Sequence, residues 1–169
     1  MPRYFEVCKN YINQDGETSI KLPERSTKNS AGYDFYASEN VVIPSIWKGL
    51  FRRLLGKGKV IKPTIVHTHV KAKMNANEYL LLANRSSNPS KYGLIMANSV
   101  GIVDSDYYSN PDNDGDIGFP FYNIFPWDIY IIKDQKLGQG IFHTFLKVDS
   151  ERTPKKTRSG GFGSTDDWF

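Results

Sequence analysis

The chain has a single cysteine, Cys8, so it cannot form an internal disulfide. It also lacks any apolar run approaching the roughly 20 residues that a membrane-spanning helix requires. Its 22 basic and 18 acidic residues give a net charge of +4, which is too balanced to indicate a nucleic-acid-binding protein. The N-terminal residues alternate apolar and polar side chains and do not resemble a signal peptide. These absences predict a cytoplasmic protein with no nucleic-acid or membrane partner.

Two common catalytic signatures are missing as well. No Walker phosphate loop is present, because Gly56 and Lys57 are followed by glycine and lack the required earlier glycine. No Gly-x-Ser-x-Gly nucleophile elbow is present, and Cys8 lies in a strand-like pattern with nothing to activate a thiolate. The sequence therefore gives little support to nucleophilic catalysis.

The composition is that of a β protein. The chain contains 14 glycines and 9 prolines, and its short apolar runs are rich in valine and isoleucine. Its 169 residues are enough for one domain with its own core. We predict an all-β sandwich, jelly roll or barrel over residues 1–148 and a flexible arm over residues 149–169. The predicted strands cover residues 4–9, 31–37, 40–43, 60–74, 79–84, 93–97, 100–104, 117–123, 128–132 and 140–148.

One segment, SIWKGLFRRLLGKGK at residues 45–59, has a helical pattern. It places Trp47, Leu50, Phe51, Leu54 and Leu55 on one face and its basic residues largely elsewhere. We expect this face to cover the core or to pack against another subunit. Binding to a membrane surface or an acidic partner protein is the alternative for a basic amphipathic helix.

The segment NSVGIVDSDYYSN, residues 98–110, carries a catalytic candidate. Residues 100–103 predict a strand that delivers Asp104 to the edge of the core. A carboxylate held there can orient and deprotonate a water molecule. The alternative is an ordinary turn, because aspartate, serine, asparagine and proline are common turn residues.

Two further motifs suggest metal sites but fit them poorly. DNDGD, residues 112–116, matches part of an EF-hand loop but has Phe121 where a bidentate glutamate is required, so we predict a solvated loop. His67 and His69 lie at i and i+2 of a predicted strand, and with His143 they could ligate zinc. Such pairs are more often surface or cross-strand residues, and we predict no metal bound directly by the protein.

Two segments offer contacts to phosphate. ANRSSNPSKYG, residues 83–93, places Arg85 and Ser86 between a strand and a predicted turn, where a guanidinium and a hydroxyl can bind phosphate oxygens. RSGGFGST, residues 158–165, combines Arg158 and two hydroxyls with glycines that let backbone N–H groups approach phosphate. Its Phe162 could stack on a base. A disordered basic end is the alternative for this second segment.

Five segments, taken in order, resemble the five motifs of the trimeric dUTP diphosphatase (dUTPase) family. They are AGYDFYA (31–37), NRSS (84–87), NSVGIVDSDYY (98–108), KLGQ (136–139) and RSGGFGST (158–165). They span nearly the whole chain, and the third and fifth are the most specific. Insertions around residues 45–59 and 108–116 are similar to those of enzymes from Gram-positive bacteria and their phages. The resemblance implies a jelly-roll-like dUTPase (β-clip) barrel with one inserted helix and a mobile C-terminal arm.

The resemblance implies hydrolysis of dUTP to dUMP and pyrophosphate, which limits uracil incorporation into DNA and supplies dUMP for dTMP synthesis. Asp104 would orient the water that attacks the α-phosphorus in line. Asn98 would read the uracil edge, and Tyr107 would lie under the deoxyribose and exclude a 2′-hydroxyl. Asp34 would lie near the metal-bound triphosphate or its arginine network. The other matched residues would contact the substrate: Arg85, Ser86, Gln139, Arg158, Phe162, Gly163, Ser164 and Thr165.

The resemblance also implies a homotrimer whose sites are shared between subunits and closed by the arm. Phe162 would cover the uracil, while Arg158, Ser164 and Thr165 would bind the γ-phosphate. Mg²⁺ would arrive with the substrate, coordinated by phosphate oxygens and water and not by the protein.

Three positions depart from the family pattern. Asn84 stands where proline is frequent, Lys136 ends a Lys-Asp-Gln-Lys segment where Gly-Glu/Asp-Arg is usual, and Asp166 stands where glycine commonly follows. These departures bear on phosphate affinity and arm conformation and not on the reaction.

Two alternative functions are compatible with this architecture. A dCTP deaminase would need a glutamate where GFPFYN, residues 118–123, has Pro120, and proline cannot transfer protons. A regulatory or structural binding module would keep the fold and use the helix at residues 45–59 to bind a partner protein.

Overall fold

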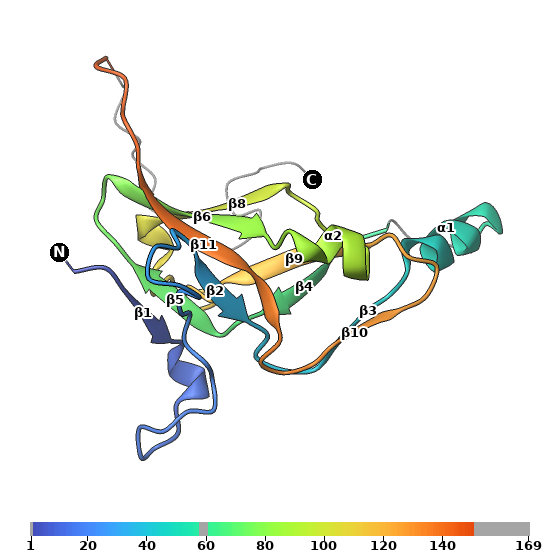
Figure 1. Cartoon of the computed structure of the whole chain (residues 1–169), viewed down its shortest axis with the longest axis horizontal. Coiled ribbons are helices and arrows are strands. Elements are labelled where there is room, and N and C mark those ends of the chain that lie inside the picture. The colour runs from blue at the N-terminus through green and yellow to red at the C-terminus, as the bar shows by residue number, and fades with distance from the viewer. Residues whose placement is uncertain (1, 58–60, 151–169) are drawn as a thin grey trace.

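A computed structural model describes residues 2–57 and 61–150 of the chain. They are mostly β (Figure 1). The strands are β1 (Tyr4–Val7), β2 (Tyr33–Tyr36), β3 (Val41–Ile43), β4 (Thr64–His67), β5 (Val70–Lys73), β6 (Glu78–Asn84), β7 (Leu94–Met96), β8 (Val100–Asp104), β9 (Gly118–Asn123), β10 (Ile129–Ile131) and β11 (Lys136–Thr144). The helices are α1 (Ile46–Leu54) and α2 (Ser87–Tyr92), with short 3-10 helices η1 (Lys9–Tyr11) and η2 (Ser105–Tyr107).

The strands pair antiparallel in four sheets. The largest has the order β2-β11-β6-β8, and a three-stranded sheet has the order β4-β9-β7. Two-stranded ribbons, β1-β5 and β10-β3, complete the described part. The rings of Phe35 on β2 and Phe119 on β9 are both fully buried and lie 5.8 Å apart, centroid to centroid. The two larger sheets therefore share one core.

Glycines in β11 make this packing possible. A Cβ atom at Gly140 would lie 2.5 Å from the Phe35 ring, and one at Gly138 would overlap the Phe119 ring. Because a methyl group fits in neither place, only glycine lets β11 pass over these buried rings.

The predicted all-β fold is confirmed, and each predicted strand overlaps an observed one. Residues 100–104 form β8 with the predicted bounds. β11 begins four residues before the predicted start at 140, because Lys136 already pairs with Tyr36 of β2 ahead of a bulge.

The prediction of one strand over residues 60–74 is wrong. His69 has a φ of 56°, a left-handed conformation that ends a β-strand in a residue other than glycine. The Thr68 hydroxyl donates to the Ile117 carbonyl at 2.7 Å and fixes the break. As a result β4 pairs with β9 in one sheet, while β5 pairs with β1 in another.

The turn predicted after Ser87 is also wrong, because these residues form α2. The helix ends at Gly93, whose φ of 61° lets its N–H donate to the Pro89 carbonyl at 3.2 Å. Gly93, six residues after Ser87, was the sequence signal that could have predicted the end of this helix.

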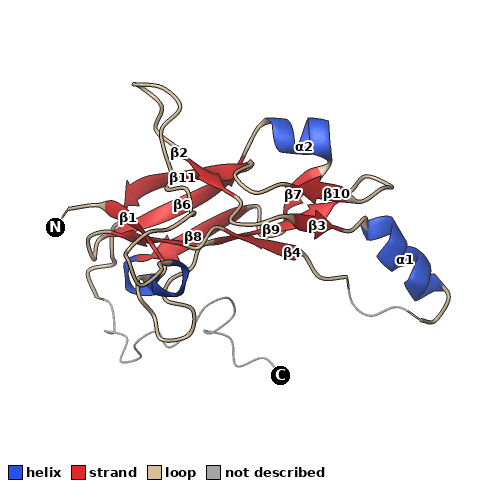
Figure 2. Cartoon of the chain, turned by 90° about the horizontal axis from the view of Figure 1, so that it is seen from below, coloured by secondary structure: helices blue, strands red, loops and turns tan. Residues whose placement is uncertain are grey.

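The predicted helix at residues 45–59 is confirmed in part as the shorter α1. Ser45 caps its first turn by accepting the Trp47 N–H at 3.2 Å. The prediction that its apolar face covers the core is wrong within one chain, because α1 has no buried residue and Leu54 is 77% exposed. The reason is that α1 follows the β10-β3 ribbon and projects from the body of the molecule (Figures 1 and 2). Packing on another subunit stays a prediction.

None of the helices in the described residues combines the length and apolarity that crossing a lipid bilayer would require.

Candidate active site

Asp34 is the centre of a buried polar network on β2. It is 2% exposed and faces β11 through the Asp34–Gln139 register pair. The Lys136 ammonium lies 2.6 Å from Oδ2, the Gln139 amide donates to Oδ1 at 3.1 Å, and the Ser26 hydroxyl also donates to Oδ2. Burial alone would raise the pKa of Asp34, but these donors outweigh burial and lower it. The carboxylate is therefore ionised at neutral pH.

The departure at Lys136 keeps a cation at this place in the sequence. Its ammonium forms an ion pair with Asp34 and leaves the side chain 37% exposed. A cationic side chain three residues before Gln139 is thus available both to Asp34 and to an incoming anion.

Arg85 and Ser86 lie at the same end of the sheet, between β6 and α2. The Arg85 guanidinium donates to the Lys136 carbonyl at 3.4 Å, which places it beside the Asp34 network. Ser86 is exposed and its hydroxyl makes no capping bond to α2. The structure therefore brings four predicted residues together: Asp34, Arg85, Ser86 and Gln139.

The departure at Asn84 has a structural explanation. The Asn84 amide donates to the Leu94 carbonyl at 2.9 Å and its oxygen accepts from Asn88 at 2.7 Å. Asn88 also donates to the Leu137 carbonyl at 2.7 Å. These bonds attach α2, and with it Ser86, to β7 and β11. A proline at position 84 could not replace them, because it has no side-chain donor.

Asp104 lies at the other end of the same sheet. It is the last residue of β8, is partly buried and pairs with Tyr79 of β6. Ala83, further along β6, pairs with Gln139. At about 3.3 Å per residue, Asp104 lies roughly 13 Å along the sheet from the level of Gln139 and roughly 20 Å from that of Arg85. The structure does not bring Asp104 to the phosphate-binding candidates of its own chain.

Asn98 and Tyr107 flank β8. Asn98 lies exposed in the turn before the strand, where its carbonyl accepts the Val100 N–H at 2.6 Å. Tyr107 ends η2 and is 7% exposed. Its hydroxyl donates to the Asp116 carbonyl at 2.9 Å and accepts from the Asn113 amide at 2.8 Å. The tyrosine is therefore positioned by the loop that follows it.

The prediction of a solvated loop at residues 112–116 is wrong for its second half, which is largely buried, whereas Asp112 is exposed. Asp116 is 6% exposed, and Asp114 forms an ion pair at 3.0 Å with Lys71, itself buried. Asp114 and Gly115 have left-handed φ values of 58° and 88°. The chain turns sharply at these two residues, and the carboxylates of Asp114 and Asp116 point inward. Sequence reasoning missed these contacts because Lys71 is 43 residues away along the chain.

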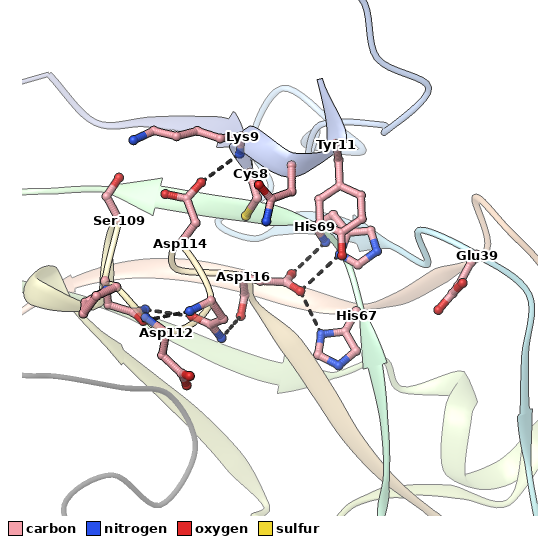
Figure 3. A pocket seen from close by; sticks show the side chains of 14 residues that line it. Cys8, Lys9, Tyr11, Glu39, His67, His69, Ser109, Asp112, Asp114 and Asp116 are labelled. Carbon is pink, nitrogen blue, oxygen red and sulfur yellow. Dashed lines mark hydrogen bonds and ion pairs between the residues drawn. The ribbon is translucent and has the colours of Figure 1, made fainter. Parts of the chain in front are cut away.

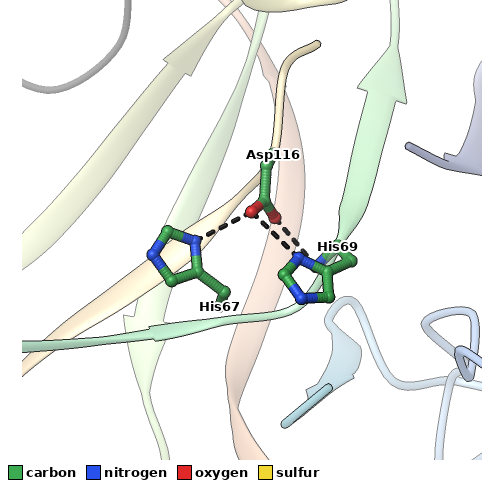
Figure 4. A group of neighbouring side chains, drawn as sticks. All are labelled: His67, His69 and Asp116. Atoms are coloured by element: carbon green, nitrogen blue, oxygen red, sulfur yellow. Dashed lines mark hydrogen bonds and ion pairs between the residues drawn. The ribbon is translucent and has the colours of Figure 1, made fainter. Parts of the chain in front are cut away.

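The loop forms one wall of a pocket of about 760 Å³ (Figure 3). Asp116 there contacts both His67 and His69 (Figure 4). His143, the third histidine considered from sequence, lies elsewhere and stacks on Tyr79 with centroids 5.4 Å apart. The two histidines lie close together, but not as i and i+2 of one strand, because β4 ends at His67 and His69 is left-handed. Sequence reasoning also missed their carboxylate partner.

Cys8 lines the same pocket but is 1% exposed, and burial raises the pKa of its thiol to about 12. A thiol in that state is a poor nucleophile. Pro120 lies on β9 opposite Ile65, so that position offers no carboxylate for a deaminase.

Arg158, Phe162, Gly163, Ser164, Thr165 and the departure at Asp166 lie outside the described residues. The roles inferred for them stay predictions.

The comparisons with known proteins agree on one family. A family model described as dUTPase matches residues 18–166. Over 164 residues the chain is 40% identical to the deoxyuridine 5′-triphosphate nucleotidohydrolase of Lactococcus lactis, covering 96% of this chain and 97% of that protein. Its fold is similar to the crystal structure of dUTPase from Streptococcus mutans, with a TM-score of 0.70, 34% identity, and coverage of 86% and 98% of the two chains.

A more distant structure shares the fold alone. It is a mutant dUTPase from phage phi11 of Staphylococcus aureus, with a TM-score of 0.62, 16% identity, and coverage of 90% of this chain and 96% of that one. That structure is described as revealing the coordination of a structural Mg(II) ion.

Proposed function

Because this chain belongs to the dUTPase family, it is a dUTP diphosphatase, and we propose that Asp104 is its general base. Its reaction is hydrolysis of dUTP to dUMP and pyrophosphate. The Asp104 carboxylate takes a proton from the water that attacks the α-phosphorus, and pyrophosphate leaves in line with that attack. The observation that carries this role is the position of Asp104 at the last residue of β8, paired with β6 in the largest sheet. A base must be held in this way to orient its water.

The residues at the Asp34 end bind the triphosphate in this proposal. Arg85 and Ser86 donate to phosphate oxygens, and Gln139 donates through the amide hydrogen that is not bound to Asp34. Asp34 positions these groups, because it already accepts from Lys136, Gln139 and Ser26. The substrate is the Mg²⁺ complex of dUTP, in which the ion is coordinated by phosphate oxygens and water.

Base and sugar are selected at the other end. Asn98 hydrogen-bonds to the uracil edge, and the Tyr107 ring lies under the deoxyribose. Both hydrogen bonds of the Tyr107 hydroxyl support this role, because a ring held by Asp116 and Asn113 cannot move aside for a 2′-hydroxyl.

A complete site requires more than one chain in this proposal. A triphosphate places its α- and γ-phosphorus atoms only a few ångströms apart, whereas Asp104 lies roughly 20 Å along the sheet from Arg85 of the same chain. Symmetric self-association resolves the mismatch by placing Asp104 of one chain beside Arg85 of another. We take the assembly to be a homotrimer, with residues 158–169 closing each site over the substrate.

The test is to incubate purified protein with dUTP and Mg²⁺ and to measure pyrophosphate. We expect one pyrophosphate per dUTP consumed and slower turnover of UTP. Release of ammonia from dCTP would identify a deaminase. Failure to turn over both dUTP and dCTP would identify a binding module. Deaminase activity and the absence of any turnover would each contradict the proposal.

A further inference from the structure

Three potential metal ligands meet in the pocket beside the loop at residues 109–116, away from Asp34 and Arg85. The Nδ1 atoms of His67 and His69 lie 2.8 and 3.1 Å from the same oxygen, Oδ2 of Asp116 (Figure 4). The other oxygen, Oδ1, accepts the backbone N–H of His69 at 2.8 Å. Each of the three residues can offer one ligand atom such that all three atoms lie within 4.8 Å of one another.

The backbone and the neighbouring ring hold this cluster in place. His69 has a φ of 56°, a left-handed conformation that is uncommon in residues other than glycine, although histidine, asparagine and aspartate adopt it more often than most. Its ring lies flat against Tyr11, with centroids 3.4 Å apart and planes 9° apart. Strained backbone of this kind persists where the surroundings over-determine it, and such positions are concentrated at functional sites.

The donor set is suited to a transition metal. Two imidazole nitrogens and one carboxylate are ligands of Zn²⁺ and its first-row neighbours, whereas Mg²⁺ prefers an all-oxygen shell. Two tetrahedral ligands about 2.0–2.1 Å from one ion are about 3.3 Å apart, so the two nitrogen–oxygen distances need to widen only slightly. We propose that His67, His69 and Asp116 bind one divalent transition-metal ion of the Zn²⁺ class, with water in the remaining position.

Metal binding changes the tautomer of each neutral imidazole ring and does not remove a proton from it. In the hydrogen-bonded state both imidazoles donate from Nδ1, because a carboxylate can only accept. In the metal-bound state each ring carries its proton on Nε2 and presents the Nδ1 lone pair to the ion. The His67 side chain is 41% exposed, which gives both the ion and the Nε2 proton a route to solvent.

Acidic side chains around the pocket favour a cation. Glu39 and Asp112 line it together with the cluster, whereas the charge of Asp114, which also lines it, is offset by its ion pair with Lys71. Lys9 also lines the pocket, and its backbone N–H donates to Asp114 at 2.8 Å.

The site is connected to Tyr107 through one peptide group. Asp116 binds the histidines through its carboxylate and accepts the Tyr107 hydroxyl through its carbonyl. An ion held by Asp116 would order the loop that supports Tyr107. This coupling, unlike metal binding itself, rests on the proposed function, in which Tyr107 contacts the sugar.

The test uses the full-length chain, freed of metal with a chelator and titrated with Co²⁺. We expect visible d–d absorption that saturates at one Co²⁺ per chain, is displaced by Zn²⁺ and is unaffected by Mg²⁺. His67→Gln and Asp116→Asn should each weaken Co²⁺ binding at least about tenfold. Since Asp116→Asn could also disturb the loop, His67→Gln, on a partly exposed side chain, is the decisive variant.

Two matched controls separate this site from other binding. His143→Gln removes a histidine outside the cluster, and Asp106→Asn removes an exposed acid that does not line the pocket. Both should leave the Co²⁺ affinity unchanged. Absence of the d–d bands, or weaker binding in the controls with normal binding in His67→Gln, would overturn the proposal.

The outcomes for the metal site and for the dUTPase reaction are independent. A chain that binds Co²⁺ but releases no pyrophosphate would retain the metal site and contradict the proposed function. A chain that hydrolyses dUTP but shows no Co²⁺ band would agree with the proposed function and contradict the metal site. If both hold, Zn²⁺ in the presence of excess Mg²⁺ should lower KM for dUTP in the wild type and not in His67→Gln, and an equal KM change in both would contradict the coupling to Tyr107.

Discussion

The two ends of the β2-β11-β6-β8 sheet differ in how many candidate site residues a single chain brings together there. At the Asp34 end, the carboxylate contacts Lys136 and Gln139, and Arg85 donates to the Lys136 carbonyl. At the Asp104 end, the strand delivers a single carboxylate whose neighbour in the ladder is Tyr79. If the proposed roles hold, phosphate binding and water activation depend on opposite ends of the sheet. Each chain would then contribute parts to more than one site.

The largest effect is expected when the Asp104 end loses its base. Asp104→Asn should lower kcat for dUTP by about 10²–10⁴-fold, because the amide cannot take a proton from water. KM should change little, since the residues at the Asp34 end are untouched. Pyrophosphate release under saturating dUTP measures this. Asp106→Asn, two residues further on and exposed, is the matched control, and near-normal turnover in Asp104→Asn would assign the base to another group.

A mixture of two inactive chains tests the comparison directly. Asp104→Asn and Arg85→Ala chains, refolded together in equal amounts, should recover up to about a quarter of wild-type activity, since each of the two contributing chains has an even chance of carrying the intact residue. A mixture no more active than its separate components would show that both residues of one chain serve the same site.

Deletion of residues 158–169 should remove most activity, at least about tenfold in kcat/KM, because an arm that closes the site aligns substrate and excludes water. The melting temperature and the size in solution should be nearly unchanged. Calorimetry and light scattering on the truncated chain check both. A truncated chain that does not fold would show that these residues are structural.

The smallest effect is expected at the Asp34 end, where several donors share one carboxylate. Lys136→Met should reduce the free energy of unfolding by about 1–2 kcal/mol, a modest value because Lys136 is partly exposed. KM for dUTP should rise several-fold. Lys91→Met, on an exposed lysine of α2, is the control.

The loss of unfolding free energy caused by Lys136→Met should become smaller as the pH falls. The pKa of Asp34 is lowered in the folded chain, so the stability from its donors is fully present above the pKa of an unfolded aspartate, about 3.9. That stability is lost as the pH falls through the lower folded-state pKa. Urea unfolding between pH 6 and pH 3 should therefore show the difference between wild type and variant shrinking at the acid end. A difference that grows towards acid would contradict the assignment.

Local sequence patterns were sufficient for the strands that carry the candidates. The apolar residues of β8 end at Asp104, and the Asp34 motif lies on β2, both where the sequence placed them. Such strands could be predicted because their residues alternate or cluster within a few positions and turn residues bound them.

Contacts between distant residues could not be predicted in the same way. Asp116 meets His67 across 49 residues of sequence, and Asn88 reaches the Leu137 carbonyl across the same separation. The break at His69 uses a left-handed backbone conformation that the strand-like pattern of the segment did not indicate, and the contacts around it hold that conformation. Tertiary contacts also set the role of Lys136, which the sequence showed only as a departure.

The ribbon that carries α1 gives the molecule a convenient place for attachment. α1 has no buried residue, and Leu54 at its end is 77% exposed, so a change there disturbs no packed side chain of its own chain. A fluorescent dye linked to a cysteine introduced at position 54 should leave the sheets and the Asp34 network intact. Because Cys8 is buried, labelling would be confined to the introduced thiol, and stepwise photobleaching of single assemblies would count the chains they contain.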